Sequence, residues 1–146
     1  MSYALDANVL LYAADSSSAR HGAAVAFLND CAQRDEPLCL TWGVISAFLR
    51  LSTGHSVYAS PLTPRDAMEL VDELLNLPQA RVLTEEPGFW KVYQAIAADV
   101  PPRGKAVSDA HLAALLRLHG VRTLYTGDAD FRRYGFLKPV DPFSAK

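Results

Sequence analysis

Short apolar segments alternate with amphipathic segments along the whole chain, and this alternation limits its fold more than any other feature. The apolar segments are typical of buried strands and lie at Tyr3–Asp6, Leu38–Thr41, Arg81–Leu83 and Thr123–Tyr125. The stretches between them repeat apolar side chains at the spacing of a helix face. Strands that alternate with helices favour a parallel sheet covered on both faces. We therefore predict an α/β fold with a central, mainly parallel sheet.

The helices predicted between these strands carry boundary signals in two places. Thr63 is a capping residue followed by Pro64 at the first helical position, and Gly120 is placed to end a later helix. The tail from Phe136 to Phe143 is expected to add a short edge strand, interrupted by Pro139 and Pro142. The predicted helices run from Val9 to about Ala14, about Arg20 to Arg34, Trp42 to Ser52, from Pro64 onward, Pro87 to Asp99 and Ser108 to His119.

Length and composition narrow the class of protein. A chain of 146 residues, half of them apolar, is expected to form a single globular domain over residues 1–146. No apolar run reaches the roughly 20 residues of a membrane helix, and Cys31 and Cys39 fit a reduced cytoplasmic protein. The net charge of −2 gives no bulk electrostatic attraction to nucleic acid, so such binding would need local basic patches.

Aspartates recur where the predicted fold would bring them together. Asp6 ends the first strand and Asp128 follows the strand at Thr123–Tyr125. The carboxyl ends of parallel strands meet at one edge, where sites in such folds lie. Asp109 shares a helix face with core residues, and Asp130 comes two residues after Asp128. We expect these four acids to converge at that edge.

Converging carboxylates repel one another unless a cation lies between them. Mg²⁺ or Mn²⁺ prefers hard oxygen ligands and keeps waters for chemistry, and such an ion activates water for attack on a phosphoryl group. Asn8 and Thr126 are placed to orient these ligands or the water. The structural alternative is that Asp6, Asp109, Asp128 and Asp130 act only as helix caps, first-turn acids and turn residues.

Three ordered segments resemble the signature segments of PIN-domain ribonucleases, and most closely those of the VapC toxins of toxin–antitoxin pairs. They are Leu5-Asp6-Ala7-Asn8-Val9-Leu10, Ser108-Asp109-Ala110-His111-Leu112-Ala113-Ala114 and Thr126-Gly127-Asp128-Ala129-Asp130-Phe131. The segment from Thr41 to Arg50 is similar to a helix in one branch of these toxins. The resemblance spans essentially the whole chain.

The resemblance implies a three-layer α/β/α domain that cleaves RNA endonucleolytically with Mg²⁺ or Mn²⁺. By position, Asp6, Asp109 and Asp128 would hold the metal, and Asp130 would join them in catalysis, with Asn8 and Thr126 in support. It also implies a transfer or ribosomal RNA substrate, a homodimer and inhibition by a cognate antitoxin. Many PIN nucleases carry a glutamate where this chain has Ala47, so we expect one metal ion per chain.

Basic residues near the acids are candidates for contacts with RNA phosphates. Such contacts would position a polyanion without reading its sequence; the alternative is ordinary solvated surface charge. His111 and His119 are expected on a helix surface without a catalytic role, and Trp42 and Trp90 in the core or an interface. The phosphate-contact candidates are Arg103, Lys105, Arg132 and Arg133, with Arg20, His21, Arg50 and His55 as weaker ones.

Two other functions remain open at this point. Asp6-Ala7-Asn8-Val9 and Gly127-Asp128 also resemble the nucleophile strand and later acids of haloacid-dehalogenase phosphatases, with Asp6 as the nucleophile. Asn8 stands where that family has an acid, which weakens the match. Alternatively, with Ala47 in place of an acid, the domain would bind RNA or protein without cleaving.

Overall fold

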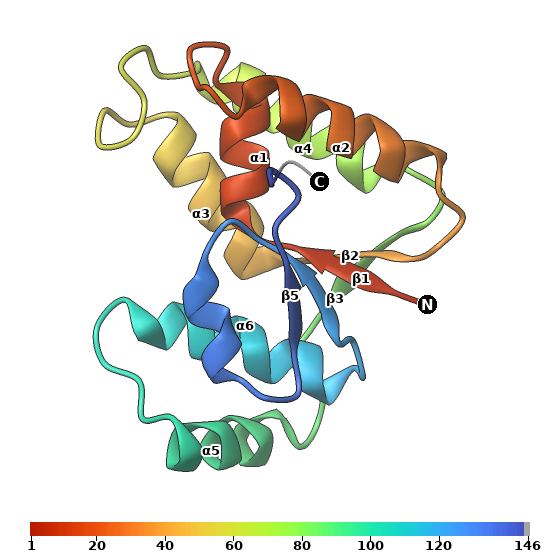
Figure 1. Ribbon diagram of the computed structural model, residues 1–146, viewed down its shortest axis with the longest axis vertical. Coiled ribbons are helices and arrows are strands. Elements are labelled where there is room, and N and C mark those ends of the chain that lie inside the picture. Colours follow the sequence, from red (N-terminus) through yellow and green to blue (C-terminus); the bar gives the residue numbers. More distant parts are fainter. Residues whose placement is uncertain (145–146) are drawn as a thin grey trace.

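Five parallel strands form one sheet in the computed structural model, which describes residues 1–144 (Figure 1). The order across the sheet is β3-β2-β1-β4-β5, so β1 is central. All four neighbouring pairs are parallel. The predicted α/β class with a parallel sheet is confirmed. The strands are β1 (Tyr3–Leu5), β2 (Leu38–Thr41), β3 (Ala80–Leu83), β4 (Thr123–Tyr125) and β5 (Lys138–Val140).

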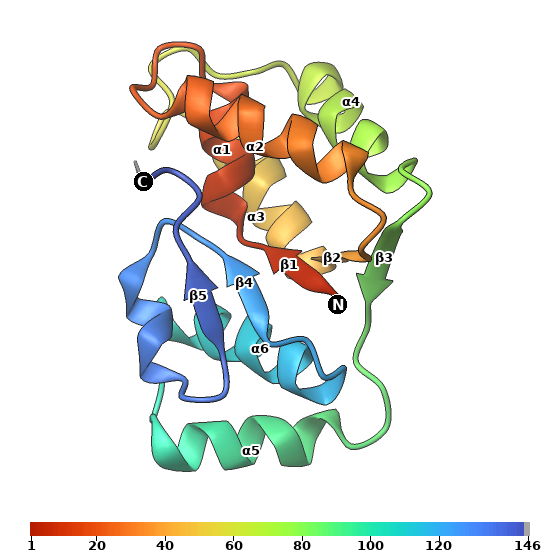
Figure 2. The same cartoon turned by 45° about the vertical axis from the view of Figure 1, so that its right-hand side comes forward.

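Helices cover both sides of this sheet and complete three layers. Figures 1 and 2 show α1, α2 and α4 on one side, and α5 and α6 on the other. No helix in the described part of the chain is long and apolar enough to cross a membrane. The helices are α1 (Ala7–Ala14), α2 (His21–Gln33), α3 (Trp42–Ser52), α4 (Pro64–Leu75), α5 (Phe89–Asp99), α6 (Ala106–Leu118) and the 3-10 helix η1 (Ala129–Arg133).

The core lies between the sheet and its helices. Leu5, Leu40 and Leu124 from three neighbouring strands are almost completely buried, as are Phe48 of α3 and Leu116 of α6. Burying each such side chain contributes about 1.5–3 kcal/mol relative to leaving it exposed. The central strand β1 is buried at all three positions because both faces of the sheet are covered there. This packing fixes the carboxyl ends of β1 and β4 side by side.

Three helix starts differ from the sequence prediction. α1 begins at Ala7, two residues before Val9. α5 begins at Phe89 and not at Pro87, because Gly88 takes a left-handed conformation with φ of 96° directly before the helix. α6 begins at Ala106, two residues before Ser108, and has no side-chain cap. Ser108, the predicted first residue, lies inside the first turn. Gly120, with φ of 72°, follows the end of α6 as predicted.

The C-terminal edge strand forms as predicted, but Pro139 does not interrupt it. Pro139 lies within β5, in register with Leu124 of β4. β5 is the last strand of the sheet, so a residue without an N–H can be accommodated on its unpaired side. Pro142 follows the strand.

The two tryptophans are not core residues. Trp42 and Trp90 are 55% and 64% exposed. The Trp90 ring stacks on Tyr93 with the planes 7° apart and the centroids 5.6 Å apart. The expectation that they lie in the core is therefore wrong, and a role at an interface stays a prediction.

Candidate active site

Asp6 is positioned at the point where the strand order reverses. β1 pairs with β2 on one side and with β4 on the other, and ligands bind at such switch points in open parallel sheets. Asp6 follows the last residue of β1 and is the N-cap of α1, where its Oδ1 accepts a hydrogen bond from the Ala7 N–H at 2.8 Å. The capping role considered for Asp6 is therefore real, and it occupies one carboxylate oxygen.

The other oxygen of Asp6 belongs to a network that joins β1 to the loop after β4. Asp6 Oδ2 accepts hydrogen bonds from Thr126 Oγ1 at 2.8 Å and from Asn8 Nδ2 at 3.2 Å. Asn8 Oδ1 accepts from the Gly127 N–H at 3.0 Å, and Thr126 Oγ1 accepts from the Asp128 N–H at 3.0 Å. Thr126 is buried. The network fixes the Asp6 carboxylate, as hydrogen-bonded partners do around metal-binding side chains.

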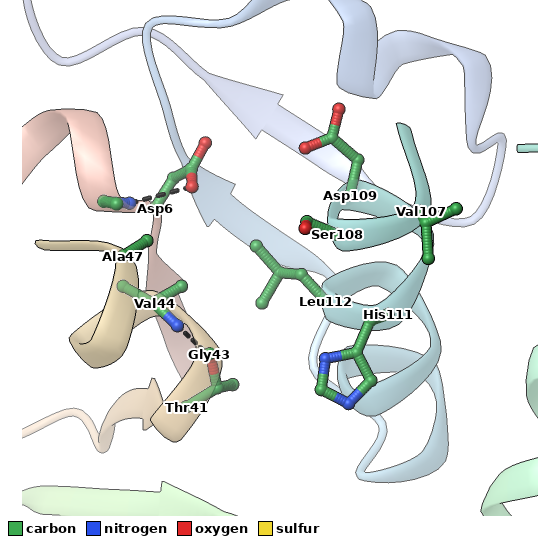
Figure 3. Close-up of a pocket in the computed structure, with 11 residues that line it drawn as sticks. Asp6, Thr41, Gly43, Val44, Ala47, Val107, Ser108, Asp109, His111 and Leu112 are labelled. Atoms are coloured by element: carbon green, nitrogen blue, oxygen red, sulfur yellow. Dashed lines mark hydrogen bonds between the residues drawn. The ribbon is translucent and has the colours of Figure 1, made fainter. Parts of the chain in front are cut away.

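Asp109 faces Asp6 across a pocket between α3 and α6 (Figure 3). The pocket has a volume of about 340 Å³. Asp109 lies in the first turn of α6, as predicted. The close-up shows the two carboxylates at one end of the pocket and His111 towards the other. The lining residues are Asp6, Ala7, Thr41, Gly43, Val44, Ala47, Val107, Ser108, Asp109, His111 and Leu112.

Burial and mutual repulsion make both carboxylates harder to ionise. Burial raises the pKa of Asp6, and the nearby charge of Asp128 adds to this, while the hydrogen bonds from Thr126 and Ala7 oppose it. Burial and the charges of Asp6 and Asp128 raise the pKa of Asp109 from 3.8 to about 6, against a smaller opposing effect of Arg133. These causes show that acids from three distant parts of the sequence share one electrostatic environment.

The ion pairs found in residues 1–144 involve neither Asp6, Asp109 nor Asp128. Within the same residues, no three His, Cys, Asp or Glu side chains lie close enough to hold a metal ion together. Mg²⁺ commonly takes only one or two carboxylates and completes its shell with water and phosphate oxygens. Asp6 and Asp109, two oxygen donors on one pocket, therefore fit this ion.

Asp128 and Asp130 lie outside the pocket between α3 and α6. Asp128 caps η1 by accepting from the Asp130 N–H at 2.8 Å, and it lines a smaller neighbouring pocket of about 50 Å³ with Arg132. The Asp130 side chain is largely exposed and pairs with Arg133 at 3.3 Å. The expected convergence of all four acids is therefore not found in residues 1–144: Asp128 is near enough to raise the pKa of Asp6 and Asp109, but it lines a different pocket, and Asp130 is exposed.

The predicted phosphate contacts lie around these acids on exposed side chains. Arg103 and Lys105 belong to the loop directly before α6, which carries Asp109. Arg132 lines the small pocket beside Asp128, and Arg133 is held by Asp130. All four side chains are therefore accessible to a polyanion, although Arg133 already has an acidic partner.

The sequence analysis did not single out Glu85, and it expected His111 on a helix surface. His111 lines the pocket, and its Nε2 lies 2.9 Å from Glu85 Oε2. This hydrogen bond is the main cause that lowers the pKa of Glu85. Glu85 follows the carboxyl end of β3, so the rule that singled out Asp6 and Asp128 would have found it as well. His119 hydrogen-bonds the Thr84 carbonyl at 2.7 Å and does not line the pocket.

Comparisons with known proteins agree with this architecture. The PIN domain family matches residues 3–137. Ribonuclease VapC48 of Mycobacterium tuberculosis is 36% identical over 144 residues, which cover 99% of both chains. The crystal structure of Mycobacterium tuberculosis VapC20, a Sarcin-Ricin loop cleaving toxin, superposes with a TM-score of 0.68 at 19% identity and covers 92% of this chain and 96% of that one. The crystal structure of VapBC2 from Rickettsia felis, bound to a DNA fragment from its promoter, superposes with a TM-score of 0.69 at 14% identity. The superposition covers 96% of this chain and 98% of that one.

The fold is an open parallel α/β sheet with acids at the point where the strand order reverses. The family match identifies this domain as a PIN domain. The chain belongs to the PIN-domain family and, within it, to the VapC ribonucleases. The resemblance noted in the sequence is thereby confirmed. The haloacid-dehalogenase alternative is not supported by this match, and the hydrogen bonds to both oxygens of Asp6 do not favour it as a nucleophile.

Proposed function

We propose that this protein is a Mg²⁺-dependent endoribonuclease, with Mn²⁺ as a substitute ion, that acts as the toxin of a toxin–antitoxin pair. The observation that carries the proposal is the pair Asp6 and Asp109, which face one pocket and take part in none of the ion pairs found in residues 1–144. Membership in the VapC ribonucleases supports the reaction class.

Asp6 and Asp109 would hold the ion, with Asp128 beside them as a third acid. A divalent ion bound there supplies a polarised phosphoryl oxygen and a water of lowered pKa. Thr126 and Asn8 keep Asp6 Oδ2 in a fixed direction. Asp130 completes the proposed catalytic group from the rim. Ala47 lines the pocket without offering an oxygen ligand, so we propose one ion per chain.

The proposed substrate is RNA, with transfer or ribosomal RNA as the expected targets. Arg103, Lys105, Arg132 and Arg133 surround the acids and would bind phosphates on either side of the scissile bond. Such contacts supply affinity without base specificity. One relative, VapC20, is described as cleaving the sarcin–ricin loop.

The proposed partners are a cognate antitoxin and a second copy of this chain, in a cytoplasmic protein with one domain over residues 1–146. The superposition on VapBC2, solved with promoter DNA, supports the antitoxin assignment.

The proposal is tested by inducing the protein in cells and mapping new RNA 5′ ends, beside the variants Asp6→Ala and Asp109→Asn. Asp66→Asn is the matched control, because Asp66 also lies in the first turn of a helix but is exposed and far from the pocket. We expect discrete new ends with the native protein and Asp66→Asn, and none with the pocket variants. Equal cleavage by Asp109→Asn, or cleavage by purified protein in excess chelator, would contradict the proposal.

A further inference from the structure

We propose that the pocket between α3 and α6 is a nucleobase subsite, which receives one unstacked base of the RNA while the phosphate of that nucleotide lies at Asp6 and Asp109. This inference rests on the proposed function and extends it, because it assigns base recognition to residues outside the acidic group. It concerns the half of the pocket that faces away from the carboxylates (Figure 3).

The walls of this half suit a flat aromatic ring. Val44 and Leu112 are buried side chains from facing helices that line it. The whole pocket, which would take the phosphate at the carboxylates as well as the base, has a volume of about 340 Å³, within the range of about 300–1,000 Å³ of ligand pockets. RNA sequence is read mainly through unstacked bases that enter such pockets and form hydrogen bonds along their edges.

His111 supplies the polar group that a base edge needs. Its Nε2 is engaged by Glu85 at 2.9 Å, and the edge of Phe89 packs against the ring with centroids 5.3 Å apart. These two contacts fix the orientation of the imidazole. Nδ1 lies beside Gly43 at one wall of the pocket, where a Cβ of residue 43 would contact it at 3.6 Å. An oriented ring nitrogen over an apolar floor can hydrogen-bond one base edge and discriminate between bases.

Gly43 gives this inference a sharp test. A methyl group there would contact His111 Nδ1 at 3.6 Å and Cε1 at 3.9 Å, both ordinary contact distances, and would cover the polar atom without a clash. Gly43 is the second residue of α3, where alanine favours the helix. Gly43→Ala should therefore stabilise the fold and obstruct the pocket, so that a loss of binding cannot be attributed to unfolding.

Gly22→Ala is the matched control. Gly22 is likewise the second residue of its helix, α2, and a Cβ there would meet nothing within 4 Å. Both variants make the same chemical change at the same helical position. Only Gly43→Ala places the new methyl in the pocket.

The experiment titrates adenosine, guanosine, cytidine and uridine 5′-monophosphates into the full chain with Mg²⁺, following the methyl NMR signals of Val44 and Leu112. Ribose 5-phosphate, which has the same phosphate but no base, is the reference ligand. We expect at least one nucleotide to bind about tenfold more tightly than ribose 5-phosphate and to shift both methyl signals. This advantage should vanish in Gly43→Ala and persist in Gly22→Ala.

The outcomes separate this inference from the proposed function. Equal affinities for all four nucleotides and ribose 5-phosphate, or an unchanged advantage in Gly43→Ala, would overturn the subsite whether or not the protein cleaves RNA. The protein could also bind a nucleotide more tightly than ribose 5-phosphate, lose this preference in Gly43→Ala, and yet cleave no RNA. That result would support the base subsite and contradict the proposed nuclease function. If cleavage occurs, His111→Leu should also change the base preferred next to the cut, and an unchanged preference would contradict the role of His111.

Discussion

The Thr126 hydroxyl donates a hydrogen bond of 2.8 Å to Asp6 Oδ2, across 120 positions of the chain. The same oxygen of Thr126 accepts from Asn8 and from the backbone of Asp128. One buried hydroxyl thus joins the ends of β1 and β4 and orients the acid between them. Because these groups are already fixed, little reorganisation is needed when an ion binds.

Asp109→Asn should stabilise the protein while it removes activity. The substitution relieves the burial and repulsion that raise the pKa of Asp109 to about 6. We expect a gain of about 1–3 kcal/mol in the free energy of unfolding at pH 8 without Mg²⁺, since one pKa unit is about 1.4 kcal/mol and solvent screens part of it. Denaturant unfolding measures this gain, and Asp66→Asn should show none. A less stable Asp109→Asn would contradict the electrostatic account.

The native protein without Mg²⁺ should lose stability as the pH rises from about 4 to about 6. In this range the folded state holds a proton on Asp109, whose pKa is about 6, while the unfolded state, with a pKa of 3.8, has released it. The free energy of unfolding therefore falls with pH and levels off above the folded pKa. In Asp109→Asn, the free energy of unfolding should fall less steeply with pH across this range. Equal slopes would show that Asp109 ionises normally.

Thr126→Val should weaken Mg²⁺ binding at neutral pH. It removes the hydrogen bond that lowers the pKa of Asp6 and leaves Asp128 N–H without its acceptor. An unpaired buried donor costs about 1–3 kcal/mol of stability. Thr123→Val is the control, since Thr123 lies three residues earlier in β4, outside this network. Calorimetry should show weaker Mg²⁺ binding for Thr126→Val but not for Thr123→Val. An unchanged affinity of Thr126→Val would contradict the claim that the hydrogen-bond network orients Asp6.

Ala47→Glu should increase the affinity for divalent ions. Ala47 lines the pocket with Asp6 and Asp109, so a glutamate there adds a carboxylate to an already repulsive group. We expect a lower melting temperature without Mg²⁺ and a larger rise on adding it. Ser46→Glu, on the exposed neighbouring position of α3, should show neither effect. The native protein should bind one Mg²⁺ per chain, and two tight equivalents in calorimetry would contradict this count.

The metal-binding roles of Asp6, Asp109 and Asp128 stay predictions, and no three acids cluster within residues 1–144. The sequence did predict the sheet, most of the helices and the meeting of Asp6 with Asp109 at one pocket. These predictions succeed because they depend on strong local patterns and on one topological rule, that sites lie beyond the carboxyl ends of parallel strands. Leu38–Thr41 and Trp42–Ser52 have the predicted bounds. The start of α6 was less predictable, because no side chain caps it.

The part of the pocket that contains His111 depends on contacts between residues far apart in the sequence, which local patterns do not reveal. Glu85 and His111 are 26 positions apart, and only the packing of the β3–α5 loop against α6 brings them together. The exposure of Trp42 and Trp90 likewise follows from which face of each helix packs inward. The apolar residues of α3 and α5 do not by themselves show which way each aromatic side chain faces.

The most direct test of the central claim is to locate Mn²⁺ in a crystal by its anomalous scattering. The account predicts one strong peak in the pocket, within coordination distance of carboxylate oxygens of both Asp6 and Asp109, and no such peak in crystals of Asp109→Asn. A fully occupied peak elsewhere on the molecule, or no pocket peak at Mn²⁺ concentrations that support RNA cleavage, would contradict it.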